Sequence, residues 1–206
     1  MIWLLIVAAY LLGSVSGSLC LGKLRGVDIR TLGSGNAGGT NALRTQGLVF
    51  ALGVVLIDVG KGLLAAWLAR HFLPGNEMAA MACVFAAVVG HIWPVWHGFR
   101  GGKGAATLVG GLILVWPQSL ILLFSVWFFS LLLTGYVGLS TVLAAISLLA
   151  SAVWSGADAE VWWFAIASSV LLTFSHRSNL QRLRSGTENR FEKARLLGRL
   201  LSGRRG

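Results

Sequence analysis

Long apolar segments separated by short polar breaks make up most of the 206-residue chain. Several of them hold about 20 residues, enough for a helix to cross a hydrocarbon layer roughly 30 Å thick. The breaks predict seven membrane helices, over residues 2–22, 48–70, 78–97, 105–115, 117–134, 139–155 and 160–175. We therefore expect an all-α polytopic membrane protein that forms a single domain over residues 1–206.

The fourth and fifth of these helices share one apolar stretch, residues 105–134, which is interrupted only by the sequence WPQS around Pro117. A helix over residues 105–115 would be about 16 Å long, so we expect the fourth helix to be short or tilted. The alternative is a single long helix over the whole stretch.

The distribution of charge favours two helices in this stretch. Four polar breaks then share one side of the membrane and carry 15 of the 17 Lys and Arg residues; they are residues 23–47, 98–104, 135–138 and 176–206. Basic residues concentrate on the cytoplasmic side, whereas a single helix would export the nine bases of the last segment. We therefore expect the N-terminus outside and the C-terminus in the cytoplasm.

The composition agrees with a membrane protein, because charged residues make up 12% of the chain against about 25% in soluble proteins. The net charge of +10 comes from bases beside apolar segments, so we expect membrane lipid as a partner and no nucleic acid. Residues 191–206 are expected to form either a short interfacial helix or a frayed tail.

Three polar segments fall on the expected cytoplasmic side, where they could form one site. The segment GFRGGKG, residues 98–104, surrounds Lys103 with glycines whose backbone amides suit an anion such as phosphate. It is not a P-loop, because residue 97 is His and Gly104 follows the lysine. A flexible loop with one basic residue is the alternative.

The segment GSGNAGGTNALR, residues 33–44, combines hydrogen-bonding side chains with four glycines and has no acid that would repel an anion. Arg44 can bind a phosphate or a carboxylate through two N–H groups. An ordinary Gly/Ser-rich connector is the alternative. The third segment, residues 176–190, follows the last helix and could contribute to the same site. The alternative is that its basic residues only end the membrane helix and contact anionic lipid head groups.

Within the membrane, Asp58 and Lys61 lie three residues apart on one helix face. Intramembrane charges are usually paired or functional, and we favour a structural ion pair here. His91 is either a buried, hydrogen-bonded histidine without a role in the site or a group that hydrogen-bonds to the site from within the membrane.

The residue types that the expected cytoplasmic segments lack also exclude several kinds of reaction. The expected cytoplasmic segments offer neither a Ser-His-Asp set, nor a His followed five residues later by Asp, nor an acid cluster for Mg²⁺. We therefore expect no metal and no cofactor. What remains is an enzyme that binds anions through bases and glycines, or alternatively a membrane transporter or binding protein for a phosphorylated anion.

The three segments, in this order and spacing, resemble those of the bacterial acyl-phosphate-dependent glycerol-3-phosphate acyltransferase family, PlsY. The resemblance rests on GSGNAGGTNALR, GHIWPVWHGFRGGKGAAT and HRSNLQRLRSGTE, and it covers nearly the whole chain. The chain departs from the family at Ala37 and Gly39, where Pro and Ala are frequent. Gly135 and Gly138 replace a frequent Arg and Ser, so that only Ser140 carries over from that loop.

This resemblance implies a seven-helix enzyme of the bacterial inner membrane, without a cofactor and with a site facing the cytoplasm. It would transfer a fatty acyl group from acyl phosphate to the 1-hydroxyl of glycerol 3-phosphate, giving lysophosphatidic acid and phosphate for phospholipid synthesis. Transient contact with the soluble producer of acyl phosphate is a further expectation.

The resemblance also implies the site residues. The expected catalytic residues are Ser34, Lys103, His176 and Asn179, with either His176 or a substrate phosphate as the general base. The expected substrate-binding residues are Asn36, Thr40, Asn41, Arg44, Gly101, Gly102, Gly104, Ser140 and Arg177.

Overall fold

The structure is a computed structural model that describes residues 1–197. Within these residues the regular secondary structure is helical and includes no strand. The chain divides into two compact units, residues 1–117 and 118–206, and the division falls at Pro117. The single domain expected from chain length stays a prediction, and each unit is described by itself.

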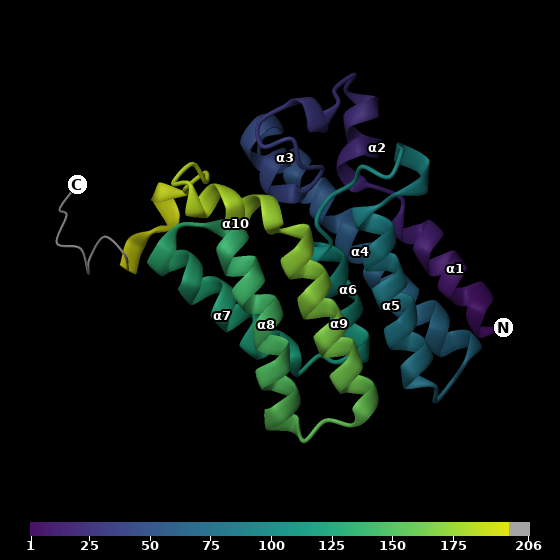
Figure 1. Cartoon of the computed structure of the whole chain (residues 1–206). Helices are drawn as coiled ribbons and strands as arrows, with labels where there is room; N and C mark the ends of the chain where they lie inside the picture. The colour runs from purple at the N-terminus through teal and green to yellow at the C-terminus, as the bar shows by residue number, and fades with distance from the viewer. Residues whose placement is uncertain (198–206) are drawn as a thin grey trace. The chain divides into compact units, whose positions relative to one another are not determined.

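Unit 1 consists of helices joined by loops, as the ribbon shows (Figure 1). Helix α4 packs against α5 and α6, and α5 packs against α1. The helices are α1 (Ile2–Gly13), α2 (Gly17–Leu24), α3 (Gly39–Gln46), α4 (Leu48–Phe72), α5 (Glu77–Ile92) and α6 (Ala105–Val115), with the 3-10 helices η1 (Ile29–Thr31) and η2 (Val95–His97).

Glycines allow the helices of unit 1 to approach closely. A Cβ atom at Gly62 of α4 would collide with the Thr107 carbonyl of α6, and one at Gly110 would collide with the Val59 carbonyl. Small residues at crossings let the backbones of membrane helices touch, which increases van der Waals contact. The crossing of α4 and α6 therefore depends on positions that tolerate no side chain.

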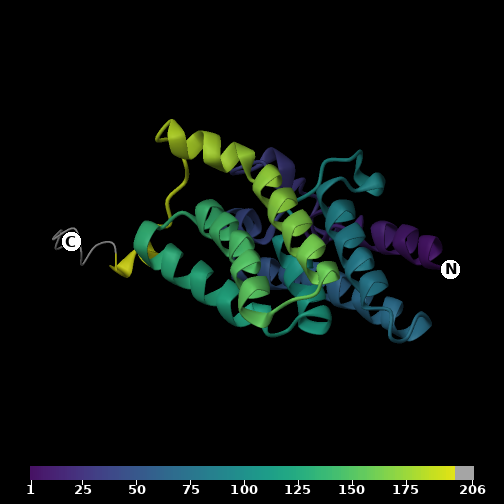
Figure 2. The ribbon, with the colours of Figure 1, turned by 60° about the horizontal axis from the view of Figure 1, so that its bottom comes forward.

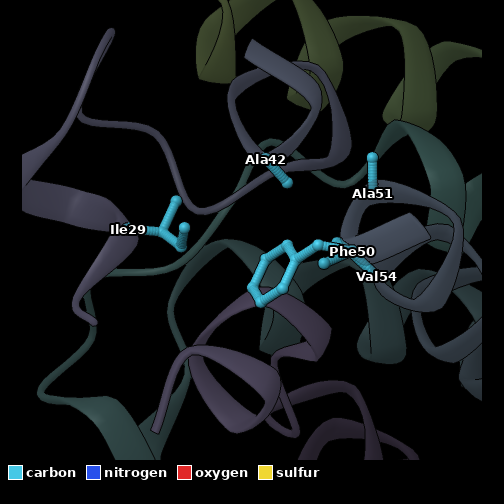
Figure 3. Close-up of a cluster of buried hydrophobic side chains, with 5 residues drawn as sticks. All are labelled: Ile29, Ala42, Phe50, Ala51 and Val54. Atoms are coloured by element: carbon cyan, nitrogen blue, oxygen red, sulfur yellow. The ribbon is translucent and has the colours of Figure 1, made fainter. Parts of the chain in front are cut away.

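A buried apolar cluster attaches the glycine-rich segment of residues 33–44 to α4 (Figure 3). It joins η1, α3 and the first turns of α4, and its members are Ile29, Ala42, Phe50, Ala51 and Val54. All five side chains are less than 7% exposed. Removing this apolar surface from water stabilises the attachment of the loop to the helix.

Unit 2 is a helical hairpin arrangement in which α8 packs against both α7 and α9, while α10 contacts α8 and α9 (Figures 1 and 2). The Ser169 hydroxyl of α9 donates to the Ala145 carbonyl of α8 at 2.6 Å. The elements are α7 (Ser119–Thr134), α8 (Val137–Ser155), α9 (Ala159–Ser175), α10 (Arg177–Arg184) and the 3-10 helix η3 (Glu192–Ala194).

Six of the seven predicted apolar helices are present with similar bounds, including the short α6. The first predicted helix is divided, because this part of the chain forms two helices, α1 and α2, bent by 43° at a break after Gly13. The break is stabilised by α4 and η2, since the Val15 carbonyl accepts from Lys61 and the Ser14 hydroxyl accepts from the Val95 amide. The short helices α3 and α10 were not predicted.

By length and apolar composition, three helical segments of the described chain could cross a membrane, or four if α1 and α2 form one bent span. These are α4, α8 and the segment Glu77–His97, while α6, α7 and α9 are shorter apolar helices. Seven spans and an outer N-terminus stay predictions. The interfacial helix or tail expected over residues 191–206 lies partly outside the described residues, which end at residue 197.

We expect Gly62→Ala to lower the thermal unfolding midpoint of the purified protein by several degrees. Its methyl group would collide with the backbone of α6, and overpacking of this kind costs about 1–3 kcal/mol. Gly60→Ala is the matched control in the same helix, because no atom lies within 4 Å of a Cβ at Gly60. Equal midpoints for the two variants would contradict the close packing of α4 on α6.

Candidate functional site

Asn41 stabilises the conformation of the glycine-rich segment of residues 33–44, here called the first segment; residues 98–104 are the second. Its side chain is 1% exposed. Its amide group donates to the carbonyls of Ile29, Leu32 and Asn36 at 2.9–3.2 Å, and its Oδ1 accepts from the Ser34 amide at 2.9 Å. Its polar atoms are thus used within the loop, and the expectation that Asn41 binds substrate stays a prediction.

The other polar residues of this segment are more accessible than Asn41. Thr40 and Arg44 are exposed on α3, and Ser34 and Asn36 are half-buried. The chain between η1 and α3 turns at Gly33, whose φ of +55° favours glycine. A Cβ there would collide with the Asn41 side chain. The loop thus presents Ser34 and Asn36 on a backbone that Asn41 fixes.

The second polar segment is fastened to the end of α5. The Gly101 amide donates to the Ile92 carbonyl at 3.2 Å, and the Gly102 amide donates to the His91 carbonyl at 3.1 Å. The expectation that the amides of residues 101–104 are all uncovered is wrong for these two, because they satisfy the last carbonyls of the helix. Lys103 is half-buried, and α6 begins directly after Gly104.

The first and second segments meet in unit 1. A Cβ at Gly102 would lie 2.9 Å from the Ala37 carbonyl oxygen. Arg30 adds a second link, since its guanidinium donates to the carbonyls of His97 at 3.1 Å and Arg100 at 3.4 Å. The structure therefore brings together the two glycine-rich segments that were expected to bind anions.

Asp28 fixes the position of Arg30, with 2.8 Å between its Oδ2 and Arg30 Nη2. The hydrogen bonds and positive charge of Arg30 lower the pKa of the Asp28 carboxyl below its usual value, so that the pair stays ionised at neutral pH. This acid therefore carries a partner and does not add an unpaired negative charge to the loops.

His176 lies in unit 2, where α9 ends and α10 begins, and it is 5% exposed. Its Nδ1 lies 2.8 Å from the Leu172 carbonyl oxygen. A carbonyl only accepts, so Nδ1 carries a hydrogen, and Nε2 of the neutral ring then carries the lone pair. The contact with Leu172 favours the tautomer that can take a proton at Nε2, and the Ser175 hydroxyl lies 3.2 Å from the same Nδ1.

Asn179 is oriented by Glu188, a residue that the sequence analysis did not assign to the site. The Asn179 amide donates to Glu188 Oε1 at 2.6 Å, and Arg182 Nε donates to Glu188 Oε2 at 2.7 Å. A Cβ at Gly138 of α8 would lie 2.7 Å from the Asn179 side chain. Glycine at this position thus makes room for Asn179.

Ser140 and Arg177 also belong to unit 2. Ser140 is fully buried, and its hydroxyl donates to the Tyr136 carbonyl at 3.0 Å. Arg177 is exposed, and its guanidinium lies 4.3 Å from the centre of the Phe174 ring. That the segments of both units share one site stays a prediction.

The expected pair of Asp58 and Lys61 is confirmed, with 3.0 Å between Oδ1 and Nζ. His91 joins it, because its Nδ1 lies 2.7 Å from Lys61 Nζ. Of the two interpretations of His91 that the sequence allows, the structure favours the first, a buried histidine bonded to this pair. The spacing of Asp58 and Lys61 predicted their contact, but only the packing of α5 on α4 reveals the third member.

Comparisons with known proteins agree with these features. The sequence profile of the family described as glycerol-3-phosphate acyltransferase matches residues 3–186. A glycerol-3-phosphate acyltransferase of Halalkalibacterium halodurans is 41% identical over 194 residues, which covers 91% of this chain and 94% of the relative. One from Chlorobaculum tepidum is 38% identical over 224 residues, covering 93% and 97%.

Solved structures give the same result. The crystal structure of PlsY, an integral membrane glycerol 3-phosphate acyltransferase, in its glycerol 3-phosphate form matches with a TM-score of 0.87 and 35% identity over 99% of both chains. Its lysophosphatidic acid form matches with a TM-score of 0.86 and 35% identity, covering 95% of this chain and 98% of that one. With its apolar helices, the protein is a multi-pass membrane protein, and it belongs to the PlsY family of glycerol-3-phosphate acyltransferases.

Proposed function

We propose that this protein transfers a fatty acyl group from acyl phosphate to the 1-hydroxyl of glycerol 3-phosphate, releasing lysophosphatidic acid and phosphate for phospholipid synthesis. The observation that carries the proposal is the meeting of two glycine-rich, basic loops in unit 1 of a PlsY-family chain. Both substrates bear a phosphate, which such loops bind through amides and cations.

The chemistry requires positioning rather than activation by the protein. Acyl phosphate is a mixed anhydride with phosphate as its leaving group. The hydroxyl oxygen attacks the carbonyl carbon, an ester bond forms, and the bond to phosphate breaks with its electron pair leaving on phosphate. An enzyme that orients two bound substrates gains much of its rate from proximity. Direct transfer needs no acyl-enzyme intermediate.

Lys103 and Ser34 serve the acyl phosphate in this proposal. The ammonium group of Lys103 stabilises the negative charge that develops on the departing phosphate, and fixed donors stabilise the oxyanion. Because the Gly101 and Gly102 amides are bonded to α5, the backbone contribution comes from Gly104 and from the first turn of α6. Gly101 and Gly102 lie close to α5 and to Ala37, where a Cβ at either position would collide with protein atoms.

Arg44 binds glycerol 3-phosphate, with Thr40 and Asn36 as neighbouring donors. Arg44 is exposed in the last turn of α3, and its planar guanidinium matches two phosphate oxygens. The buried cluster beneath α3 supports this position, since Ala42 belongs to it.

His176 takes the proton of the attacking hydroxyl in this proposal. The lone pair on Nε2, implied by the Nδ1 contact with Leu172, is the state that a general base requires. Asn179, held by Glu188, orients the same hydroxyl, and Ser140 and Arg177 contribute to substrate binding from the same unit.

In this proposal the reaction takes place at the cytoplasmic face of the bacterial inner membrane, which the positive-inside tendency of the basic segments supports. In this arrangement acyl phosphate comes from a soluble enzyme that contacts the protein transiently, and its acyl chain lies in the lipid phase.

The proposal is tested with the purified protein in detergent, by measuring phosphate release and lysophosphatidic acid formation. Both products should require acyl phosphate and glycerol 3-phosphate together. Binding of either compound without formation of products would instead support a transporter or binding protein for a phosphorylated anion.

We expect Lys103→Ala to abolish acyl transfer, because the leaving phosphate loses its cation. Lys23→Ala, at an exposed lysine of the same unit, is the matched control and should retain activity. Circular dichroism and gel filtration check that both variants are folded. Near-normal turnover of Lys103→Ala would remove this residue from the reaction centre.

We expect Arg44→Ala to raise the apparent KM for glycerol 3-phosphate about tenfold or more, because a charge-assisted hydrogen bond is lost. The KM for acyl phosphate should change less. Arg44→Lys keeps the charge but loses the paired N–H donors of the guanidinium. Its KM for glycerol 3-phosphate should therefore fall between those of the unchanged protein and Arg44→Ala. A larger effect on the acyl phosphate KM would reverse the assignment of Arg44.

We expect His176→Asn to reduce kcat by about 10²–10⁴-fold, the usual contribution of a general base. The Asn amide can keep the hydrogen bond to Leu172 while the basic nitrogen is lost, so the fold should persist. A loss of tenfold or less would show that a substrate phosphate takes the proton.

A further inference from the structure

A buried charged cluster lies in unit 1, outside the residues to which the proposed reaction assigns roles. Asp58 and Lys61 of α4 and His91 of α5 are each less than 5% exposed. Lys61 Nζ lies 2.8 Å from the Val15 carbonyl, 3.0 Å from Asp58 Oδ1 and 2.7 Å from His91 Nδ1. The Gly17 amide donates to Asp58 Oδ1 at 3.2 Å.

These contacts determine which ring nitrogen of His91 carries the hydrogen. An ammonium group has three hydrogens and no lone pair, so each of its three close partners must accept. Nδ1 of His91 is one of them, at 2.7 Å. A hydrogen on Nδ1, directed at Asp58 Oδ1 at 3.4 Å, would face the ammonium hydrogens instead. Neutral His91 therefore carries its hydrogen on Nε2.

Nε2 of His91 lies against the second glycine-rich loop. A Cβ at Gly102 would collide with this nitrogen and would lie 2.9 Å from the Ala37 carbonyl oxygen. The ring and this carbonyl therefore lie on the same side of Gly102. The backbone of the loop is bonded to the same part of α5, through the carbonyls of His91 and Ile92.

We propose that His91 is a positioning residue for acyl transfer, held by Lys61 and Asp58 as an Nε2–H donor beneath the loop that carries Lys103. The ring of His91 limits how closely Gly102 can approach α5. Its Nε2–H group faces the place where the two glycine-rich loops meet. The cluster thereby places Lys103 for the phosphate of the acyl donor. The kinetic part of this inference rests on the proposed function, whereas the tautomer does not.

A purely structural ion pair would make a different prediction. It would stabilise the fold, and its loss would reduce the amount of active protein without changing the KM for either substrate. The two roles are therefore separated by a substrate-specific KM change and by the tautomer of His91 in folded protein.

Two variants of His91 isolate its donor. His91→Asn retains an acceptor for Lys61 at the position of Nδ1 and removes the group that faces Gly102. His91→Gln restores an N–H at about the position of Nε2. We expect His91→Asn to raise the KM for acyl phosphate about tenfold, because losing the group beneath Gly102 misplaces the loop that carries Lys103. The KM for glycerol 3-phosphate should stay within about twofold, and His91→Gln should recover most of the loss.

The tautomer is measured by NMR of substrate-free protein labelled with ¹⁵N-histidine. The chain has four histidines, and the signal missing from His91→Asn identifies His91. The paired variant Asp58→Asn with Lys61→Met avoids leaving one buried charge alone. We expect the hydrogen on Nε2 in the unchanged protein and on Nδ1 in the paired variant. His71→Gln, at an exposed histidine of α4, is the control and should leave both KM values unchanged.

A hydrogen on Nδ1 of His91 in the unchanged protein would overturn the inference. So would a folded His91→Asn variant with an unchanged KM for acyl phosphate. If the unchanged protein transfers no acyl group from acyl phosphate, the proposed function and the kinetic role of His91 fail, while the NMR result still tests the arrangement of the cluster.

Discussion

The ion pair of Asp58 and Lys61 is the interaction on which the arrangement of unit 1 depends. A charge among apolar helices is costly unless other groups satisfy it. Here the Val15 carbonyl, the Gly17 amide and His91 complete the bonding, so the break between α1 and α2, the middle of α4 and the end of α5 meet at one point. The glycine-rich loop is then bonded to the same end of α5, through the carbonyls of His91 and Ile92.

This construction suits the proposed reaction between two phosphate-bearing substrates, because it gives the polar loops fixed positions on an apolar scaffold. Asn41 fixes the first loop from within, and Arg30 connects it to the second loop. With an activated acyl donor the enzyme has to align the hydroxyl with the carbonyl and accept the charge that develops, so the precision of these loops matters more than a reactive side chain.

The sequence predicted the features that depend on composition and spacing: the bounds of six apolar helices, the short α6 before Pro117, and the contact of Asp58 with Lys61. It did not predict the break after Gly13, since the break depends on bonds from α4 and η2 that the sequence does not reveal. The roles of Asn41 and Glu188 were also missed. An amide or a carboxylate looks the same in a sequence whether it binds substrate or a carbonyl of its own loop, and only the folded contacts distinguish these cases.

The choice of acyl donor tests the central claim most directly, because the loops are proposed to bind the phosphate that leaves. Purified protein with glycerol 3-phosphate is given either acyl phosphate or acyl-coenzyme A of the same chain length, and lysophosphatidic acid is measured by mass spectrometry. The account predicts product from acyl phosphate and none above background from acyl-coenzyme A. Comparable rates with the two donors, or product from the thioester alone, would contradict it.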